Sequence, residues 1–431
     1  MTRSVRVAAM QLRARDRIEF SRSLESTLVS LHGVCRSADL VVLPEGTFPA
    51  YVLGKQPLDE AATADTVERL SDLARSTNTV IVAGIALPRG GVVYNSAIVI
   101  DADGSLAGRA DKLFLWHFDR HWFAQGKRLA PVRTSVGTLG VLICADGRLP
   151  TIARSLVDHG AEVLIMPTAW VTSGRDPSAL ENVQADLLAR VRAYENRAPF
   201  VAANKCGAEL GMVAYCGKSQ IVDACGEVVA IAGEHRAETL QAAVELSEER
   251  PARAPLARPA PRVNRLERSL RIAISFDPLP SDIDERLEML DDEYAIALHD
   301  DERLGMLDRE IPIASVEDSV ALDPAGLVAY RLAGYSLICW TTDLGSPWTE
   351  RIARARALEL RLHLVVFDRA AGRAFAVDPD GTILAGTFGD YRLASFSLDP
   401  HKTRQTAVAP GTDVREGLER VATIEERAAA T

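Results

Sequence analysis

The chain has 431 residues, of which 47% are hydrophobic and 25% are charged, and its formal net charge is −10. This length exceeds one ordinary core, so two lobes are expected, and the composition is that of a soluble globular protein. The acidic charge argues against an electrostatic nucleic-acid binder, and no run of eighteen apolar residues predicts a membrane span.

The first half of the chain alternates strand and helix patterns, which predicts a layered α/β fold. The N-terminal stretch MTRSVRVAAMQL has too short an apolar run for a signal peptide, so a cytoplasmic protein is expected. The predicted elements are strands at 6–12, 38–46 and 79–87, helices at 20–36 and 67–75, and a hairpin at 95–113.

The next strand, in GTLGVLICADGRLP, ends at Cys144, and a helix is predicted to begin near Pro150. The thiol thus lies at a strand-to-helix turn, where the positive end of the helix favours thiolate. The six cysteines are too sparse for a disulfide framework and lack the CxxC spacing of a zinc site.

A cysteine nucleophile needs a base or a positive neighbour, because an unassisted thiol has a pKa of about 8.5. Glu45, in VVLPEG, and Lys112, in RADKLFLW, both follow predicted strands. Functional sites gather at such strand ends in open α/β sheets. Alone, each residue is more often a loop charge, and a lone cysteine is more often part of the core. The order Glu, Lys, Cys favours a joint role.

This trio and its flanking residues resemble the carbon-nitrogen hydrolases of the nitrilase superfamily. The motifs are DLVVLPEG with Glu45, RADKLFLW with Lys112 and GVLICADGRLP with Cys144. The resemblance covers about residues 4–246 and includes the stretches YNSAIVIDADG, GAEVLIMPTAW, RAYENRAPFVAANKCG and GKSQIVDACGEVV.

The resemblance implies a four-layer α-β-β-α sandwich and a thiol hydrolase without metal or organic cofactor. In that scheme Glu45 takes the proton of Cys144, and Lys112 and the backbone N–H of Ala145 hold the oxyanion. A thiol reagent is then expected to label Cys144 before the other cysteines. Replacing Glu45 or Lys112 should remove activity without a large loss of stability.

Two further positions leave alternatives open. Relatives often carry a second glutamate before an aromatic segment, where this chain has Asp119 in FDRHWFAQG. Asp119 could orient Lys112 or substrate, or form a loop salt bridge with Arg120 or Arg128. Trp170, at the end of MPTAW, could form a pocket wall or pack in the core.

Beyond residue 246 the sequence repeats itself in shortened form. Three stretches return in chain order, which indicates an internal repeat. Four prolines between residues 247 and 266 predict a linker before the second copy. The three pairs of similar stretches are RSVRVAA with RSLRIAI, ARVRAYENR with ARARALELR, and GKSQIVDACGEVVA with GRAFAVDPDGTILA.

The expected organisation is a catalytic domain at 1–246, a linker at 247–266, a degenerate nitrilase-like domain at 267–400 and a tail at 401–431. An ungapped pairing of Pro150 with Pro324 sets Asp318 opposite Cys144, so the second copy lacks the nucleophile. The same pairing assigns Cys339 to a core strand. A tandem copy could form an internal pseudo-dimer, and a homo-oligomer is also possible.

The predicted function is hydrolysis of a small amide or N-carbamoyl (ureido) compound through a thioester. A true nitrilase is disfavoured because those enzymes commonly have Trp after the cysteine, where this chain has Ala145. A noncatalytic scaffold is the third possibility, and the intact trio argues against it. The expected partner is a small molecule, with no nucleic acid, membrane or metal.

Overall fold

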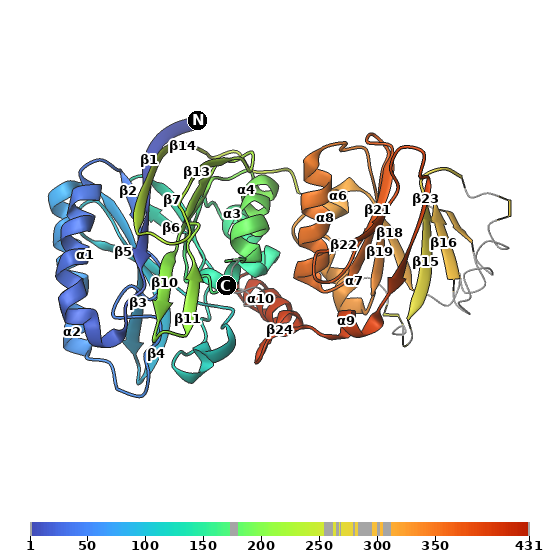
Figure 1. Cartoon of the computed structure of the whole chain (residues 1–431). Coiled ribbons are helices and arrows are strands. Elements are labelled where there is room, and N and C mark those ends of the chain that lie inside the picture. The colour runs from blue at the N-terminus through green and yellow to red at the C-terminus, as the bar shows by residue number, and fades with distance from the viewer. Residues whose placement is uncertain are drawn as a thin grey trace. The chain divides into compact units, whose positions relative to one another are not determined.

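The computed structural model (Figure 1) describes residues 2–172, 180–253, 262–263, 267, 269–278, 281–282, 295–299, 302–304 and 312–429. These residues form two compact units. The first comprises Met1–Pro251, Ala409–Thr412 and Glu419–Thr431, and the second comprises Ala252–Val408 and Asp413–Leu418. Most of the predicted linker 247–266 lies outside the described residues.

The larger sheet of the first unit has eight strands in the order β11-β10-β1-β2-β3-β4-β5, and β14 also pairs with β1. Strands β1, β2 and β3 run parallel, so their carboxyl ends meet at one edge of the sheet. The strands are β1 (Thr2–Arg13), β2 (Leu40–Val42), β3 (Val80–Arg89), β4 (Val92–Ile100), β5 (Leu106–Asp111), β10 (Lys205–Glu209), β11 (Val213–Cys216) and β14 (Glu238–Ser247).

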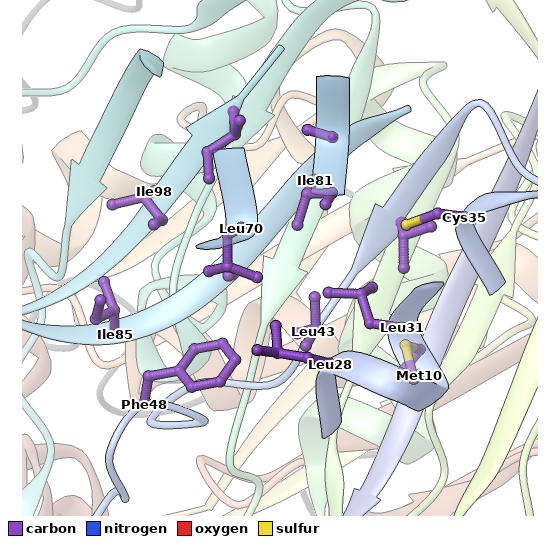
Figure 2. Close-up of a cluster of buried hydrophobic side chains, with 14 of the residues drawn as sticks. Met10, Leu28, Leu31, Cys35, Leu43, Phe48, Leu70, Ile81, Ile85 and Ile98 are labelled. Atoms are coloured by element: carbon purple, nitrogen blue, oxygen red, sulfur yellow. The ribbon is translucent and has the colours of Figure 1, made fainter. Parts of the chain in front are cut away.

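Helices α1 (Phe20–Cys35) and α2 (Glu60–Thr77) cover this sheet through one apolar cluster (Figure 2). The buried residues of α1 recur every three or four positions, which is the spacing of one helix face. Helix α2 begins after Asp59, whose side chain accepts hydrogen bonds from two backbone N–H groups of the first turn. The labelled cluster contains Met10, Leu28, Leu31, Cys35, Leu43, Phe48, Leu70, Ile81, Ile85 and Ile98.

The smaller sheet of the first unit has six strands in the order β13-β12-β9-β8-β7-β6. Its central strands β7, β8 and β9 are parallel, and β12 and β13 continue the sheet in antiparallel sense. The strands are β6 (Val132–Thr134), β7 (Gly137–Val141), β8 (Val163–Pro167), β9 (Phe200–Ala203), β12 (Gln220–Val222) and β13 (Val228–Ile231).

The two sheets contact each other through β1, β2 and β3 on one side and β8 and β9 on the other. Helices α3 (Pro150–Asp158) and α4 (Ala189–Asn196) cover the smaller sheet. The first unit is therefore a four-layer α-β-β-α sandwich, as the resemblance to the nitrilase superfamily implies. Within the described part of the chain, no helix is long and apolar enough to cross a membrane.

The second unit contains a sheet of order β17-β16-β15-β23 and another of order β18-β19-β20-β21-β22. Strands β18, β19 and β20 run parallel, followed by antiparallel β21 and β22. This sequence of pairings matches that of β7, β8, β9, β12 and β13. The strands are β15 (Leu270–Ser275), β16 (Ala295–His299), β17 (Glu302–Leu304), β18 (Ile313–Val316), β19 (Leu337–Thr342), β20 (His363–Asp368), β21 (Arg373–Val377), β22 (Ile383–Gly386) and β23 (Leu393–Leu398).

Residues 401–431, expected as a tail, carry regular structure and are divided between the two units. They contain most of α9 (Pro400–Arg404), the two-stranded sheet β24 (Ala407–Ala409) and β25 (Thr412–Asp413), and α10 (Val414–Ala429). The chain thus returns to the first unit after running through the second. Among the described residues, the other helices of the second unit are α6 (Asp318–Ala321), α7 (Val328–Ala333) and α8 (Pro347–Leu360).

Replacing Leu31 with Ala should destabilise the first unit by about 2–5 kcal/mol, because this fully buried side chain packs in the α1 cluster and its loss leaves a cavity. The matched variant Val29→Ala changes a side chain of the same helix that is 72% exposed. It should alter the free energy of unfolding by no more than about 0.5 kcal/mol. Urea-induced unfolding measures both, and equal effects would contradict this packing.

Candidate active site

Glu45 lies directly beyond β2 and is fully buried. Its backbone N–H donates to the carbonyl of Thr168, which follows β8 of the other sheet, at 3.3 Å. Gly84 of β3 makes room for this turn, because a Cβ at Gly84 would clash with the Pro44 oxygen and lie 2.6 Å from Glu45 Cα. The carboxylate is thus held between the two sheets.

Lys112 follows β5, and its buried ammonium lies between two carboxylates. Nζ is 2.8 Å from Glu45 Oε1 and 2.7 Å from Asp119 Oδ2. Burial opposes the charge, but Asp119 and Glu45 outweigh it and hold the pKa of Lys112 well above its usual value. Lys112 is therefore a fixed cation, unsuited to act as a base near neutral pH.

Asp119 lies in the 3-10 helix η2 (His117–His121), and its side chain is completely buried. Besides Lys112, it accepts hydrogen bonds from the Tyr51 hydroxyl at 2.6 Å and from the backbone N–H of Trp116 at 2.8 Å. Of the alternatives open from the sequence, the structure places Asp119 against Lys112. The aspartate side chain is shorter than the glutamate that relatives often carry. It still reaches the Lys112 ammonium because η2 brings the backbone of Asp119 close to Lys112.

Cys144 begins the 3-10 helix η3 (Cys144–Arg148) directly after the strand segment that contains β7, and only 5% of it is exposed. Its φ of +47° is unusual for a residue other than glycine, and such backbone strain concentrates at functional sites. Burial and the charge of Glu45 raise the pKa of Cys144 to about 12, although Lys112 lowers it. The sequence predicts a thiolate stabilised by the end of a helix, whereas this pKa means that the thiol of Cys144 is protonated near neutral pH.

Asp146, two residues after the cysteine, connects the Cys144 turn to the Lys112 segment. One carboxylate oxygen accepts from the backbone N–H groups of Leu113 and Phe114 at 3.0 and 2.7 Å, and the other accepts from Ile143 at 3.0 Å. Burial raises the pKa of Asp146 to about 7 against these hydrogen bonds. The only sequence signal that Asp146 connects these two segments is its position in the motif ADGRLP.

Asn95 and Lys205 also support Glu45, although sequence reasoning assigned neither a role. Asn95 Nδ2 donates to Glu45 Oε1 at 2.7 Å. Lys205 Nζ donates to the carbonyl of Gly46 at 2.9 Å and pairs with Glu209. Both residues lie within stretches that support the resemblance to the nitrilase superfamily, YNSAIVIDADG and FVAANKCG. Their place in these stretches is the signal that could have identified them.

The remaining predicted site residues are buried as well. Ala145 follows Cys144 in η3 and is 1% exposed. Trp170 is equally buried beyond β8, where its backbone N–H donates to Asn204 Oδ1 at 2.8 Å. Its indole N–H has no hydrogen-bond partner among the described residues. In the same part of the chain, no group of three His, Cys, Asp or Glu residues could hold a metal ion.

Comparisons with known proteins show the family of the chain. The model of the carbon-nitrogen hydrolase family matches residues 6–254. A probable nitrilase of Schizosaccharomyces pombe is 30% identical over 50% of this chain and 79% of its own length. An (R)-stereoselective amidase of a Pseudomonas species is 31% identical over 53% of this chain and 81% of its own length.

Among solved structures, a carbon-nitrogen hydrolase from Helicobacter pylori G27 superposes with a TM-score of 0.50 and 26% identity, covering 56% of this chain and 89% of the other. The chain belongs to the carbon-nitrogen hydrolase family of the nitrilase superfamily, and it is an enzyme of that class. The family match ends near the boundary of the first unit at Pro251.

The buried ion pairs change one expectation from the sequence: removing Lys112 should cost stability as well as activity. Lys112→Met leaves Glu45 and Asp119 buried without their cation, which should destabilise the first unit by about 3–5 kcal/mol near pH 8. Chemical denaturation near pH 8 measures it.

The control is Lys127→Met, which removes an exposed lysine from the same region of the chain. Its free energy of unfolding should stay within about 0.5 kcal/mol of the unaltered chain near pH 8. A Lys112→Met variant as stable as this control would mean that the ammonium is not needed to compensate the two carboxylates.

Proposed function

We propose that the first unit hydrolyses the C–N bond of a small amide or N-carbamoyl compound through a thioester on Cys144. The observation that supports this proposal best is that the two oxygens of the Glu45 carboxylate have different surroundings. Oε1 accepts from Lys112 and Asn95, whereas the buried Oε2 has no hydrogen-bond partner among the described residues. One oxygen is held in place, and the other is left to accept a proton.

In the first step, the Cys144 proton passes to Glu45 while sulfur bonds to the carbonyl carbon. The transfer must accompany attack, because a thiol with a pKa of about 12 is almost wholly protonated near neutral pH. The tetrahedral intermediate then expels ammonia or an amine, which takes the proton from Glu45. This breaks the C–N bond and leaves the thioester.

In the second step, Glu45 removes a proton from water as its oxygen attacks the thioester carbon. The C–S bond then breaks, and the sulfur recovers the proton. The product leaves as a carboxylic acid from an amide, or as a carbamic acid from an N-carbamoyl compound. Lys112 remains charged throughout and supplies positive charge near the developing oxyanion, together with the Ala145 N–H. Asp119 orients Lys112 through Oδ2. No metal or organic cofactor takes part in this scheme.

The substrate class rests on both the sequence and the relatives. Similarity to an amidase supports an amide substrate, and similarity to a probable nitrilase keeps a nitrile as the alternative. Ala145 stands where nitrilases commonly have Trp, which favours the amide. A noncatalytic scaffold would have no need for a buried cation between two carboxylates beside a thiol. Trp170, with an unpartnered indole N–H, is proposed as a polar contact for substrate.

The decisive experiment measures ammonia release over a panel of small amides, ureido acids and nitriles. Cys144→Ala should abolish turnover, whereas Cys35→Ala should retain it, although burial also raises the pKa of Cys35 to about 12. Glu45→Gln should lower kcat by about 10² to 10⁴ through loss of the base. Substantial turnover by purified Cys144→Ala would overturn the mechanism.

Thiol labelling needs a different design from the one expected from the sequence. Cys225 is exposed, whereas Cys144 is buried and protonated, so a general thiol reagent should modify Cys225 first. A substrate-like electrophile in a Cys225→Ser background is the appropriate probe for Cys144.

We propose further that the second unit is a shortened copy of the same fold without the active site. A buried arginine supports this relation. In the first unit, Arg192 Nε donates to the Gly147 carbonyl at 3.0 Å, and Nη1 lies 2.6 Å from a glutamate three residues later. In the second, Arg356 donates to the Ala321 carbonyl at 3.0 Å, and the matching glutamate is 3.1 Å away.

The pairing that sets Pro150 against Pro324 also sets Gly147 against Ala321, since each pair is 174 residues apart (324 − 150 and 321 − 147). It places Asp318 opposite Cys144. Asp318 begins α6, and its side chain accepts a hydrogen bond from the Trp340 indole N–H at 2.9 Å. The residue at the nucleophile position would thus make a structural contact instead of taking part in catalysis. The matching strand order and pairing sense of the two units support the same proposal.

Cys339, buried in β19 of the second unit, is proposed to be a core residue. Cys339→Ser should leave kcat unchanged per folded molecule, and active-site titration with a substrate-like inhibitor should give one reactive thiol per chain. Two titratable sites, or loss of kcat in folded Cys339→Ser, would contradict an inactive second unit. The internal pseudo-dimer stays a prediction, testable by measuring the mass of the active species in solution.

A further inference from the structure

Thr412, 295 residues away from His117 along the chain, contacts the loop that carries Asp119. It belongs to the segment Ala409–Thr412, which is part of the first unit, and it is fully buried. Its hydroxyl oxygen accepts a hydrogen bond from the His117 N–H at 2.7 Å, and the hydroxyl donates to the Leu115 carbonyl at 3.3 Å. One hydroxyl therefore holds the loop at two points.

The residue between these points connects directly to the catalytic cation. Trp116 donates its backbone N–H to Asp119 Oδ2 at 2.8 Å, and the same oxygen lies 2.7 Å from Lys112 Nζ. Because Thr412 binds the residues on both sides of Trp116, it fixes the direction of that N–H. A shift of this backbone would move Asp119 relative to Lys112.

The backbone of the loop needs such an external contact. His117 has a φ of +43°, in the left-handed region that residues other than glycine rarely occupy. A conformation of this kind costs of the order of 1–3 kcal/mol and persists only where neighbouring groups hold it. Within the loop, the Asp119 N–H donates to the Trp116 carbonyl, whereas the His117 N–H has its acceptor in Thr412.

We propose that Thr412 is a positioning residue for the reaction, acting through Trp116 and Asp119 on Lys112. This inference rests on the proposed function, because it assigns Lys112 the oxyanion. It also implies that a catalytic unit needs chain from beyond the family match, which ends at residue 254. The hydroxyl does not touch substrate, so its effect should fall on kcat rather than on KM.

The test compares Thr412→Val with Thr412→Ser in the full chain. Val keeps the shape of Thr but leaves the His117 N–H without its acceptor. The resulting misplacement of Lys112 should lower kcat about tenfold, the upper end of what one buried hydrogen bond contributes, with KM changed less than about twofold. Ser restores the hydroxyl and should recover most of kcat.

The control is Thr66→Val, which removes a buried hydroxyl that donates to Ala62 O at 2.7 Å within α2 of the same unit. It should lower the melting temperature as Thr412→Val does, while kcat stays normal. An unchanged kcat in Thr412→Val, or an equal loss in Thr66→Val, would overturn the positioning role.

Hydrogen–deuterium exchange separates this inference from the proposed function. If the unaltered chain hydrolyses nothing in the panel, the proposed function fails, but exchange over residues 115–123 still tests the restraint by Thr412. Faster exchange there in Thr412→Val than in Thr66→Val supports the contact. Equal exchange in the two variants would overturn it, whatever the activity.

Discussion

The proposed active site depends on one buried interaction, the Lys112 ammonium between Glu45 and Asp119. Three charged side chains without solvent contact are tolerated only because each is paired at hydrogen-bond distance and supported by neutral donors. Asn95 supports Glu45, and Tyr51 supports Asp119. The two sheets, the η2 loop and the glycine at position 84 all place these groups with the precision that such pairing requires.

In the proposed mechanism, the charge distribution around Cys144 allows a buried cysteine to serve as a nucleophile. The triad carries one cation and one anion beside the thiol, and the second anion, Asp119, is directed at the cation. Burial and Glu45 keep the thiol protonated, which protects it from reaction in the absence of substrate. The proposed chemistry then requires a carbonyl carbon to arrive before the proton moves. Positioning, rather than a preformed thiolate, becomes the main demand on the protein.

If the second unit is a shortened copy, as proposed, it separates the requirements of the fold from those of the chemistry. One buried arginine contact in each unit corresponds, and one sheet of each unit has the same strand order and pairing sense. In the proposed alignment, Asp318 occupies the position of the nucleophile, and its side chain binds an indole N–H. The packing can be retained when the nucleophile is replaced, because the arginine and strand contacts do not involve the triad.

The sequence by itself determined the family, the four-layer fold of the first unit, and the candidates Glu45, Lys112 and Cys144. The three candidates follow from local signals, namely apolar strands that end in a chemically capable residue and the turns that follow them. The family and the four-layer fold follow from the resemblance of the surrounding motifs to the carbon-nitrogen hydrolases. It could not settle whether Asp119 meets Lys112 or an arginine, because both choices agree with the same local pattern.

Only the tertiary structure decided the contacts between distant segments. Asn95 is 50 residues from Glu45, Asp146 is 33 from Leu113, and Thr412 is 295 from His117. No periodicity records such pairs, since each depends on how separate strands and loops are brought together. The protonation state of Cys144 was likewise decided in three dimensions: the sequence indicates a helix end that favours thiolate, whereas burial and a nearby carboxylate determine the pKa.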